Sequence, residues 1–122
     1  MTGLSSLPEV TAYITKDGSE IRELLHPNQH AVKNQSLAEA RIPPGTRTIR
    51  HHHLLTEEIY HVTQGSGMMQ LGEAHFPVKT GDSIAIAPGT AHCIENTGQE
   101  ILHILCCCAP AYSHEDTVLL EG

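Results

Sequence analysis

Short strand-like segments recur about every ten residues along most of the chain, and glycine and proline separate them. Apolar and β-branched residues fill segments such as 36–42, 83–87 and 101–108, whereas Pro43-Pro44-Gly45 and Pro88-Gly89 interrupt the pattern. No window has the spacing of apolar residues that is typical of an amphipathic helix. The sequence therefore predicts an all-β barrel or sandwich.

The length of 122 residues suits one domain with one hydrophobic core. We expect an irregular N-terminal segment with edge strands over residues 1–35, a barrel over 36–110 and a C-terminal tail over 111–122. Only 3% of the residues are aromatic, so Ile, Leu, Val and Ala must fill most of the core.

The charge balance excludes several classes of partner. Seven Lys and Arg against fourteen Asp and Glu give a formal net charge of −7, which argues against a nucleic-acid or anionic membrane surface. No apolar run is long enough to span a membrane, and the N-terminus lacks the pattern of a signal peptide. We therefore expect a cytoplasmic protein with no nucleic-acid or membrane partner.

The four cysteines are Cys93 and the run Cys106-Cys107-Cys108, and no C-x-x-C spacing occurs. This usage argues against a disulfide scaffold or a zinc knuckle and fits a reducing cytoplasm. Our interpretation of the run is that it supplies small apolar side chains to a buried strand. The alternative is a redox or metal-binding thiol cluster, but successive side chains on a strand point to opposite faces.

Histidine is unusually frequent, with ten residues in the chain. His51 and His53 are two apart in an expected strand over 46–53, so they share one face. Either Glu57 or Glu58 enters the next strand close to them, and His92 begins a later strand. Imidazole is the commonest protein ligand for metals, so this arrangement predicts a metal site.

Three neutral imidazoles and one carboxylate suit one divalent ion, with Fe, Mn, Zn, Ni and Co as candidates. On a six-coordinate ion, four protein ligands leave two adjacent positions for water, substrate or O₂. A tetrahedral zinc ion would instead be filled by the four ligands unless its shell expands.

Two sequence motifs contain these residues. The first, G-x5-H-x-H-x(3,4)-E-x6-G, matches Gly45, His51, His53, Glu58 and Gly65. The second, G-x5-P-x-G-x2-H-x3-N, matches Gly81, Gly89, His92 and Asn96, although Ala87 holds the proline position and Pro88 follows it. With these motifs the chain resembles a small single-domain cupin, a member of the double-stranded β-helix or jelly-roll family.

The resemblance implies that His51, His53, Glu58 and His92 hold one metal ion inside the barrel. It selects Glu58 rather than Glu57, because the six-residue gap to the motif's last glycine starts at Glu58. It also implies a homodimer and a small-molecule substrate.

Further pocket residues follow from strand parity and position. Tyr60 shares a face with Glu58, and Tyr60 and His103 are candidate proton donors or acceptors. Arg47 lies an even number of residues before the two motif histidines in the same expected strand, so its side chain shares their face. It is therefore a candidate for holding an anionic substrate at the cavity rim. Gln35 and His103 are candidates for lining the barrel from neighbouring strands.

Fold and metal site do not define a reaction. The leading hypothesis is a metal-dependent enzyme that acts on a small polar metabolite, with dioxygenase chemistry slightly favoured over sugar-phosphate isomerisation. The alternative is a module that binds a small ligand or the metal itself without turnover.

Overall fold

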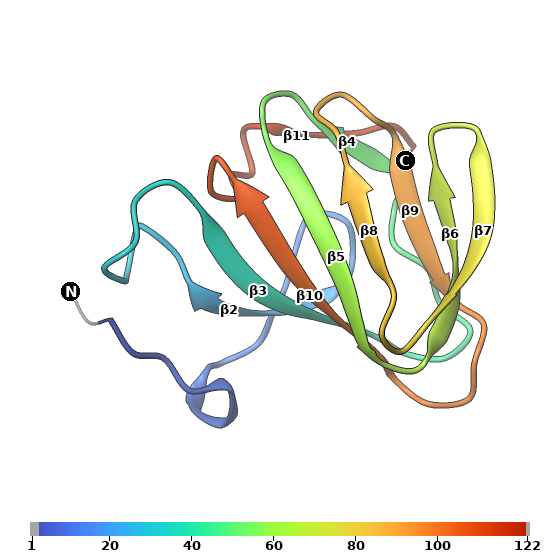
Figure 1. Ribbon diagram of the computed structural model, residues 1–122, viewed down its shortest axis with the longest axis horizontal. Coiled ribbons are helices and arrows are strands. Elements are labelled where there is room, and N and C mark those ends of the chain that lie inside the picture. Colours follow the sequence, from blue (N-terminus) through green and yellow to red (C-terminus); the bar gives the residue numbers. More distant parts are fainter. Residues whose placement is uncertain (1–2, 122) are drawn as a thin grey trace.

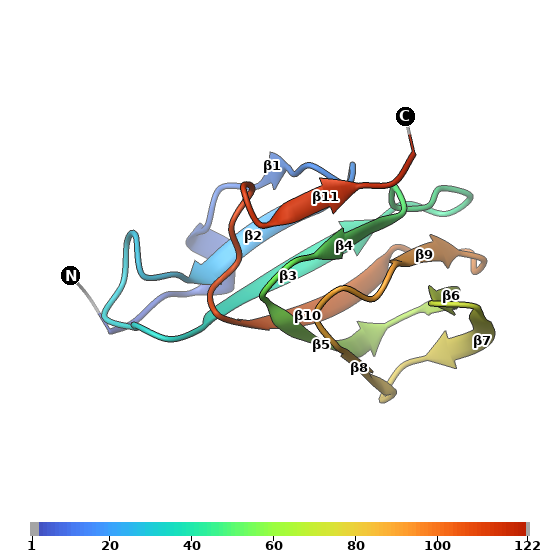
Figure 2. The same ribbon diagram turned by 90° about the horizontal axis from the view of Figure 1, so that it is seen from above.

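The computed structural model describes residues 3–121 and consists of two antiparallel β-sheets that face each other (Figures 1 and 2). A short 3-10 helix and eleven strands follow one another in this order: η1 (Leu7–Glu9), β1 (Tyr13–Ile14), β2 (Glu20–Leu25), β3 (Ser36–Ile42), β4 (His51–His53), β5 (Glu57–Gln64), β6 (Ser66–Leu71), β7 (Ala74–Lys79), β8 (Ser83–Ile86), β9 (His92–Asn96), β10 (Leu102–Ala109) and β11 (Thr117–Leu119). Within these residues, no helix has the length and apolarity needed to span a membrane.

The two sheets combine strands that are distant in sequence. The first has the order β1-β2-β3-β10-β5-β8, and the second has the order β11-β4-β9-β6-β7. Strands from the N-terminal segment and from the C-terminal tail thus extend the sheets at their edges. The expected all-β jelly-roll barrel is confirmed.

The structure differs from the sequence expectation between residues 46 and 50. We expected one strand over 46–53, but only His51–His53 forms β4. The backbone N–H of Thr48 donates to the Ile94 carbonyl in β9, whereas the N–H of Ile49 donates to the Asp17 carbonyl before β2. Because consecutive residues bond to different elements, this segment cannot continue a regular ladder.

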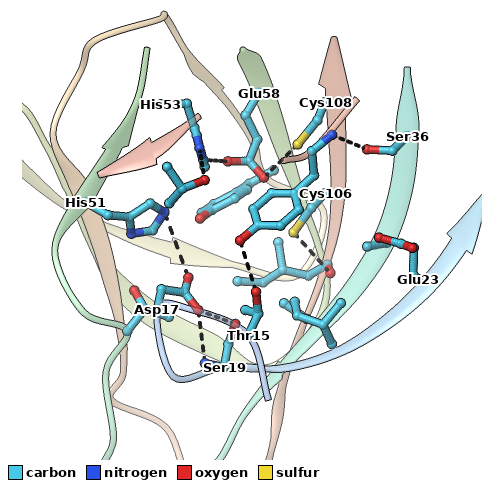
Figure 3. A pocket seen from close by; sticks show the side chains of 18 of the residues that line it. Thr15, Asp17, Ser19, Glu23, Ser36, His51, His53, Glu58, Cys106 and Cys108 are labelled. Carbon is cyan, nitrogen blue, oxygen red and sulfur yellow. Dashed lines mark hydrogen bonds and ion pairs between the residues drawn. The ribbon is translucent and has the colours of Figure 1, made fainter. Parts of the chain in front are cut away.

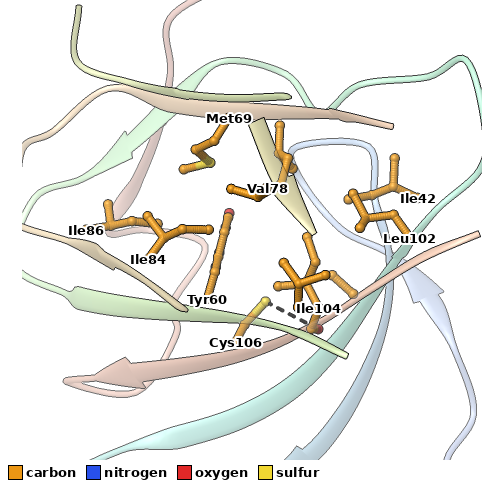
Figure 4. Close-up of a cluster of buried hydrophobic side chains, with 12 residues drawn as sticks. Ile42, Tyr60, Met69, Val78, Ile84, Ile86, Leu102, Ile104 and Cys106 are labelled. Carbon is orange, nitrogen blue, oxygen red and sulfur yellow. Dashed lines mark hydrogen bonds between the residues drawn. The ribbon is translucent and has the colours of Figure 1, made fainter. Parts of the chain in front are cut away.

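Aliphatic side chains fill the barrel, as the composition predicts. Alternate residues of β5, β8 and β10 are buried, which is the period-two pattern of a strand with one face on a core. Figure 4 shows the cluster, in which the labelled side chains are Ile42, Tyr60, Met69, Val78, Ile84, Ile86, Leu102, Ile104 and Cys106. Tyr60 and Ile104 belong to this cluster and also line a cavity, so the core forms the cavity floor.

The asparagine of the second motif ties the sheets together. Asn96 is 1% exposed, and its Nδ2 donates to the carbonyls of Ile42 and Glu100 at 2.8 Å each. Its Oδ1 accepts the N–H of Gly98 at 2.9 Å. The side chain therefore joins β9 to the end of β3 and to the turn before β10, which fixes the strand that begins with His92.

Candidate metal centre

Three histidine rings meet inside the barrel. His51 and His53 lie on β4, and His92 is the first residue of β9, where it pairs directly with His51. One nitrogen from each ring lies within 4.8 Å of the other two, and all three residues are buried. The ring centroids of His51 and His92 are 4.3 Å apart. Side chains from two separate motifs are thus brought to one point.

Backbone carbonyls orient two of these rings. His51 Nδ1 lies 2.7 Å from the Ile49 oxygen, and His92 Nδ1 lies 2.9 Å from the Thr90 oxygen. A carbonyl only accepts hydrogen bonds, so each Nδ1 carries the proton. The Nε2 atoms therefore present lone pairs to the interior, which is the form that binds a metal.

A threonine hydroxyl orients the third ring. His53 Nδ1 lies 2.9 Å from Thr117 Oγ1, and this hydroxyl donates its own proton to the Ser113 carbonyl at 2.9 Å. The hydroxyl must then accept from His53, so His53 also carries its proton on Nδ1. Sequence reasoning missed Thr117, because its contact depends on the pairing of β11 with β4.

Glu58 lies against two of the three rings. Its Oε1 lies 3.1 Å from His53 Nε2 and 3.7 Å from His92 Nε2, and its Oε2 accepts from Cys108 Sγ at 3.3 Å. Burial raises the pKa of this carboxyl, but the adjacent imidazoles of His53 and His92 outweigh that effect and lower the pKa to about 2. Glu58 is therefore a carboxylate at neutral pH.

The facing atoms of His53 and Glu58 need a cation between them. In a neutral ring with its proton on Nδ1, His53 Nε2 is an acceptor like the carboxylate oxygen of Glu58, and the two atoms lie 3.1 Å apart in a buried site. Only a proton or a metal ion makes that contact favourable. Two ligand atoms bound at about 2.1 Å and at right angles on one ion lie about 3 Å apart, which fits this spacing.

Two more observations fit a metal ion. His92 is 0% exposed, and its Nε2 has no hydrogen-bond partner, although buried polar atoms are normally paired. Burial lowers the pKa of His51, and the neighbouring His92 lowers it further, so His51 is held neutral as ligation requires.

A cavity with a volume of about 50 Å³ lies beside His51, His53 and Glu58. Figure 3 shows these three side chains at the cavity. Its lining includes Tyr60, whose side chain is 4% exposed and whose ring centroid lies 5.9 Å from that of His92. Burial raises the pKa of Tyr60 well above its ordinary value, so the hydroxyl keeps its proton.

The structure places the other expected pocket residues outside this lining. Arg47 pairs with Glu121 on the surface at 2.5 Å and is drawn away from the cavity. His103 lies on the opposite face of β10, with its Nδ1 3.6 Å from Glu39. Gln35 is exposed just before β3. The alternation of side chains along a strand did not reveal that Arg47 pairs with Glu121 or that His103 lies beside Glu39.

Other cavity residues were missed by sequence reasoning. Asp17, in the turn between β1 and β2, has Oδ2 at 3.9 Å from His51 Nε2. Glu23 and Tyr112 also line the cavity, and they come from the segments that we expected to be edge and tail. No local signal marked them, because their place depends on how the terminal strands join the two sheets.

Two of the clustered cysteines face the cavity. Cys106 and Cys108 are buried and line it, whereas Cys107 lies on the other face of β10. Burial raises the pKa of both cavity thiols, and the charge of Glu58 raises it further. In the metal-free protein they are therefore thiols rather than thiolates.

Comparison with known proteins agrees with this geometry. A family model described as "Cupin domain" matches residues 38–108. The chain is 55% identical over 113 residues to the "Uncharacterized protein MJ1618" of Methanocaldococcus jannaschii, which covers 93% of this chain and 90% of that protein. It is 33% identical over 86 residues to an "Oxalate-binding protein" of Thermotoga maritima, which covers 70% of this chain and 71% of that protein.

Solved structures give the same fold. A crystal structure from Thermotoga maritima, described as a predicted oxalate decarboxylase, has a TM-score of 0.76 at 27% identity and covers 88% of this chain and 98% of its own. A Klebsiella pneumoniae protein with a double-stranded β-helix domain has a TM-score of 0.77 at 19% identity and covers 100% of both chains.

The metal-free protein should lose stability as the pH falls. The pKa of His51 is lowered from its ordinary value of 6.5, so the unfolded state takes up a proton first. The free energy of unfolding should then fall below pH 6.5, with a slope of up to about 1.4 kcal/mol per pH unit for this group. Urea denaturation in a series of buffers between pH 7.5 and 5, at roughly equal ionic strength, measures this free energy of unfolding. In His51→Gln the slope should shrink; a stability that stays level or rises on acidification would contradict the assignment.

Thr117→Val should weaken metal binding without removing a ligand. The substitution keeps the shape of the side chain but leaves His53 Nδ1 without its acceptor, so the ring is less well oriented. We expect the dissociation constant for Co²⁺ to rise about 10- to 100-fold in a competition titration with a chelator. Thr63→Val, on the exposed side of β5, is the matched control and should bind like the unaltered protein. Equal affinities of all three proteins would show that Thr117 does not support His53.

Proposed function

Because the chain belongs to the cupin family, we propose that it is a metal-dependent enzyme in which His51, His53, His92 and Glu58 hold one divalent ion. A small polar metabolite would reach this ion through the cavity. The observation that carries the proposal is the buried pair of acceptors, His53 Nε2 and Glu58 Oε1, at 3.1 Å. A shared proton or metal ion makes this contact favourable, and the adjacent rings of His51 and His92, the latter with an unpartnered Nε2, favour the metal ion.

The bound ion would supply Lewis-acid activation of a substrate oxygen or, as Fe(II), chemistry with O₂. The chain itself holds the ligands in place through the Nδ1 contacts with Ile49, Thr90 and Thr117. Tyr60 lies beside His92 with a protonated hydroxyl, and we assign it the role of proton donor to the substrate. His103 faces away from the cavity, so its position does not support a catalytic role.

Among the chemistries considered, oxygenase activity is better supported than sugar-phosphate isomerisation. A phosphate group is normally bound by arginine, lysine or a helix N-terminus. Among the described residues that line the cavity, none is lysine or arginine, and Arg47 is engaged by Glu121. A phosphorylated substrate would therefore meet no counter-charge other than the metal ion.

A non-catalytic binding module is the second candidate. The relative from Thermotoga maritima that shares 33% identity carries the name of a binding protein, and a cupin cavity with a metal is sufficient for that role. The enzyme and the binding module would use the same metal site, and they differ only in whether the bound ligand is converted to a product.

We further propose a cytoplasmic homodimer. The four cysteines are free, which suits a reducing compartment. Ile59 is 46% exposed and lies beside Cys107 on the outer face of the six-stranded sheet, so this face offers apolar surface for a second copy.

His92→Ala should abolish stoichiometric metal binding. The variant removes the ligand whose Nε2 is buried and unpartnered, while Asn96 at the other end of β9 still holds the strand. Elemental analysis after loading with Co²⁺ and gel filtration should give about one ion per chain for the unaltered protein and less than about a tenth of that for His92→Ala. His75→Ala, on exposed β7, is the control and should retain the metal. Full occupancy in His92→Ala would refute the ligand assignment.

Oxygen consumption separates the enzyme from the binding module. The iron-loaded protein should take up O₂ with at least one member of a panel of thiols, diketones and phenolics, measured with an oxygen electrode. The zinc-loaded protein should not, since zinc has no redox chemistry. Binding of panel members without O₂ uptake or product would favour the module.

A further inference from the structure

We propose that the cavity selects a small ligand that carries hydrogen-bond donors and no net negative charge, with Asp17 and Glu23 as its acceptors. This inference rests on the proposed function and names the class of substrate for that same site. It is carried by two carboxylates that reach the cavity from the N-terminal strands and by the lack of basic side chains around it.

Asp17 is fixed beside the histidines, and within residues 3–121 its second carboxylate oxygen accepts no hydrogen bond. Its Oδ1 accepts from the backbone N–H of Ser19 at 3.0 Å and from the Ser19 hydroxyl at 2.6 Å. Its backbone carbonyl accepts from Ile49 at 2.7 Å, which anchors the turn to the segment before β4. Oδ2 then points toward His51 Nε2 at 3.9 Å. A ligand on the metal ion would meet this oxygen.

Glu23 supplies the second carboxylate at the far side of the same space. Figure 3 shows Asp17 beside His51, with Glu23 across the cavity on β2. Burial raises the pKa of Tyr13 to about 12, and the charge of Glu23 contributes to this rise. Glu23 thus acts electrostatically on groups that line the cavity.

Basic residues near the cavity are turned to other partners. Lys16 is next to Asp17 in sequence, but its Nζ donates to the carbonyls of His114 and Thr117 at 3.0 and 2.7 Å. Arg41 pairs with Glu39 on the other face of β3. None of the seven Lys and Arg residues of the chain lines the cavity.

The resulting charge disfavours an anion. A divalent ion with one carboxylate ligand retains one positive charge, and Asp17 and Glu23 more than cancel it. In a partly dehydrated space, repulsion between like charges within the same small cavity lowers the affinity for an anion on the order of ten-fold or more. A dianion such as oxalate therefore gains little beyond chelation, whereas hydroxyl, amide or ammonium groups find acceptors in Asp17 and Glu23.

The lining and the volume of the cavity also limit the ligand. The hydroxyls of Thr15 and Tyr112, which lie 3.1 Å apart, are on its polar side, and Ile21 and Ala40 form part of an apolar wall. With a volume of about 50 Å³, the cavity admits a molecule of a few heavy atoms. A compact polar metabolite with one chelating group and one or two donors matches this space.

Oxalate, oxamate and oxamide test this proposal, because they have similar size and carry two, one and no negative charges. Each is titrated into the Co²⁺-loaded protein by calorimetry and by the visible spectrum of the ion. In the double variant Asp17→Asn/Glu23→Gln we expect oxalate affinity to rise at least about ten-fold, oxamate affinity to rise less and oxamide affinity to stay level or fall. Glu73→Gln removes one negative charge, as Glu23→Gln does, but in the exposed turn before β7, and it should alter none of these affinities.

The single variant Glu23→Gln, which leaves the Asp17–Ser19 bonds intact, should show the same order with a smaller effect. Equal shifts for the three ligands, or no shift, would overturn the proposed selectivity while leaving the metal site standing. Co²⁺ content is measured first, and a protein that takes up no Co²⁺ would refute the proposed function and this selectivity together.

Discussion

Two acceptor atoms held together in a buried site are the constraint on which this structure depends. His53 and Glu58 each have a second contact that fixes their orientation, from Thr117 on one side and Cys108 on the other. Neither side chain is free to turn its lone pair toward water, so a proton or a metal ion shared between them stabilises the 3.1 Å contact. His92 Nε2, buried without a partner, adds a third lone pair beside the same point.

The jelly-roll topology makes this convergence possible. Pairing of β4 with β9 places His51 opposite His92, although the two residues belong to separate motifs. The amide of Asn96 anchors the far end of β9. The terminal strands then decide the chemistry of the surroundings, because the β1–β2 turn brings Asp17 to the cavity and β11 brings Thr117 to His53.

The sequence predicted those features that depend on local periodicity and motif spacing. Strand parity put His51 and His53 on one face and Tyr60 on the face of Glu58, and the structure brings these side chains to one cavity. The sequence did not predict contacts between elements that are far apart in the chain. Alternation along the strand put Arg47 on the face of His51 and His53, but its ion pair with Glu121 holds it at the surface.

Cysteine placement illustrates the same limit. Alternation along β10 separates Cys107 from Cys106 and Cys108, but only the pairing of β10 with β3 and β5 shows which set faces the cavity. Thiols close to a metal site make ligand identity the central question. X-ray absorption spectroscopy of the zinc-loaded protein answers it most directly. We expect nitrogen and oxygen ligands at about 2.0–2.1 Å with the outer-sphere scattering of three imidazoles, whereas a sulfur ligand at about 2.3 Å or fewer imidazoles would contradict the assignment.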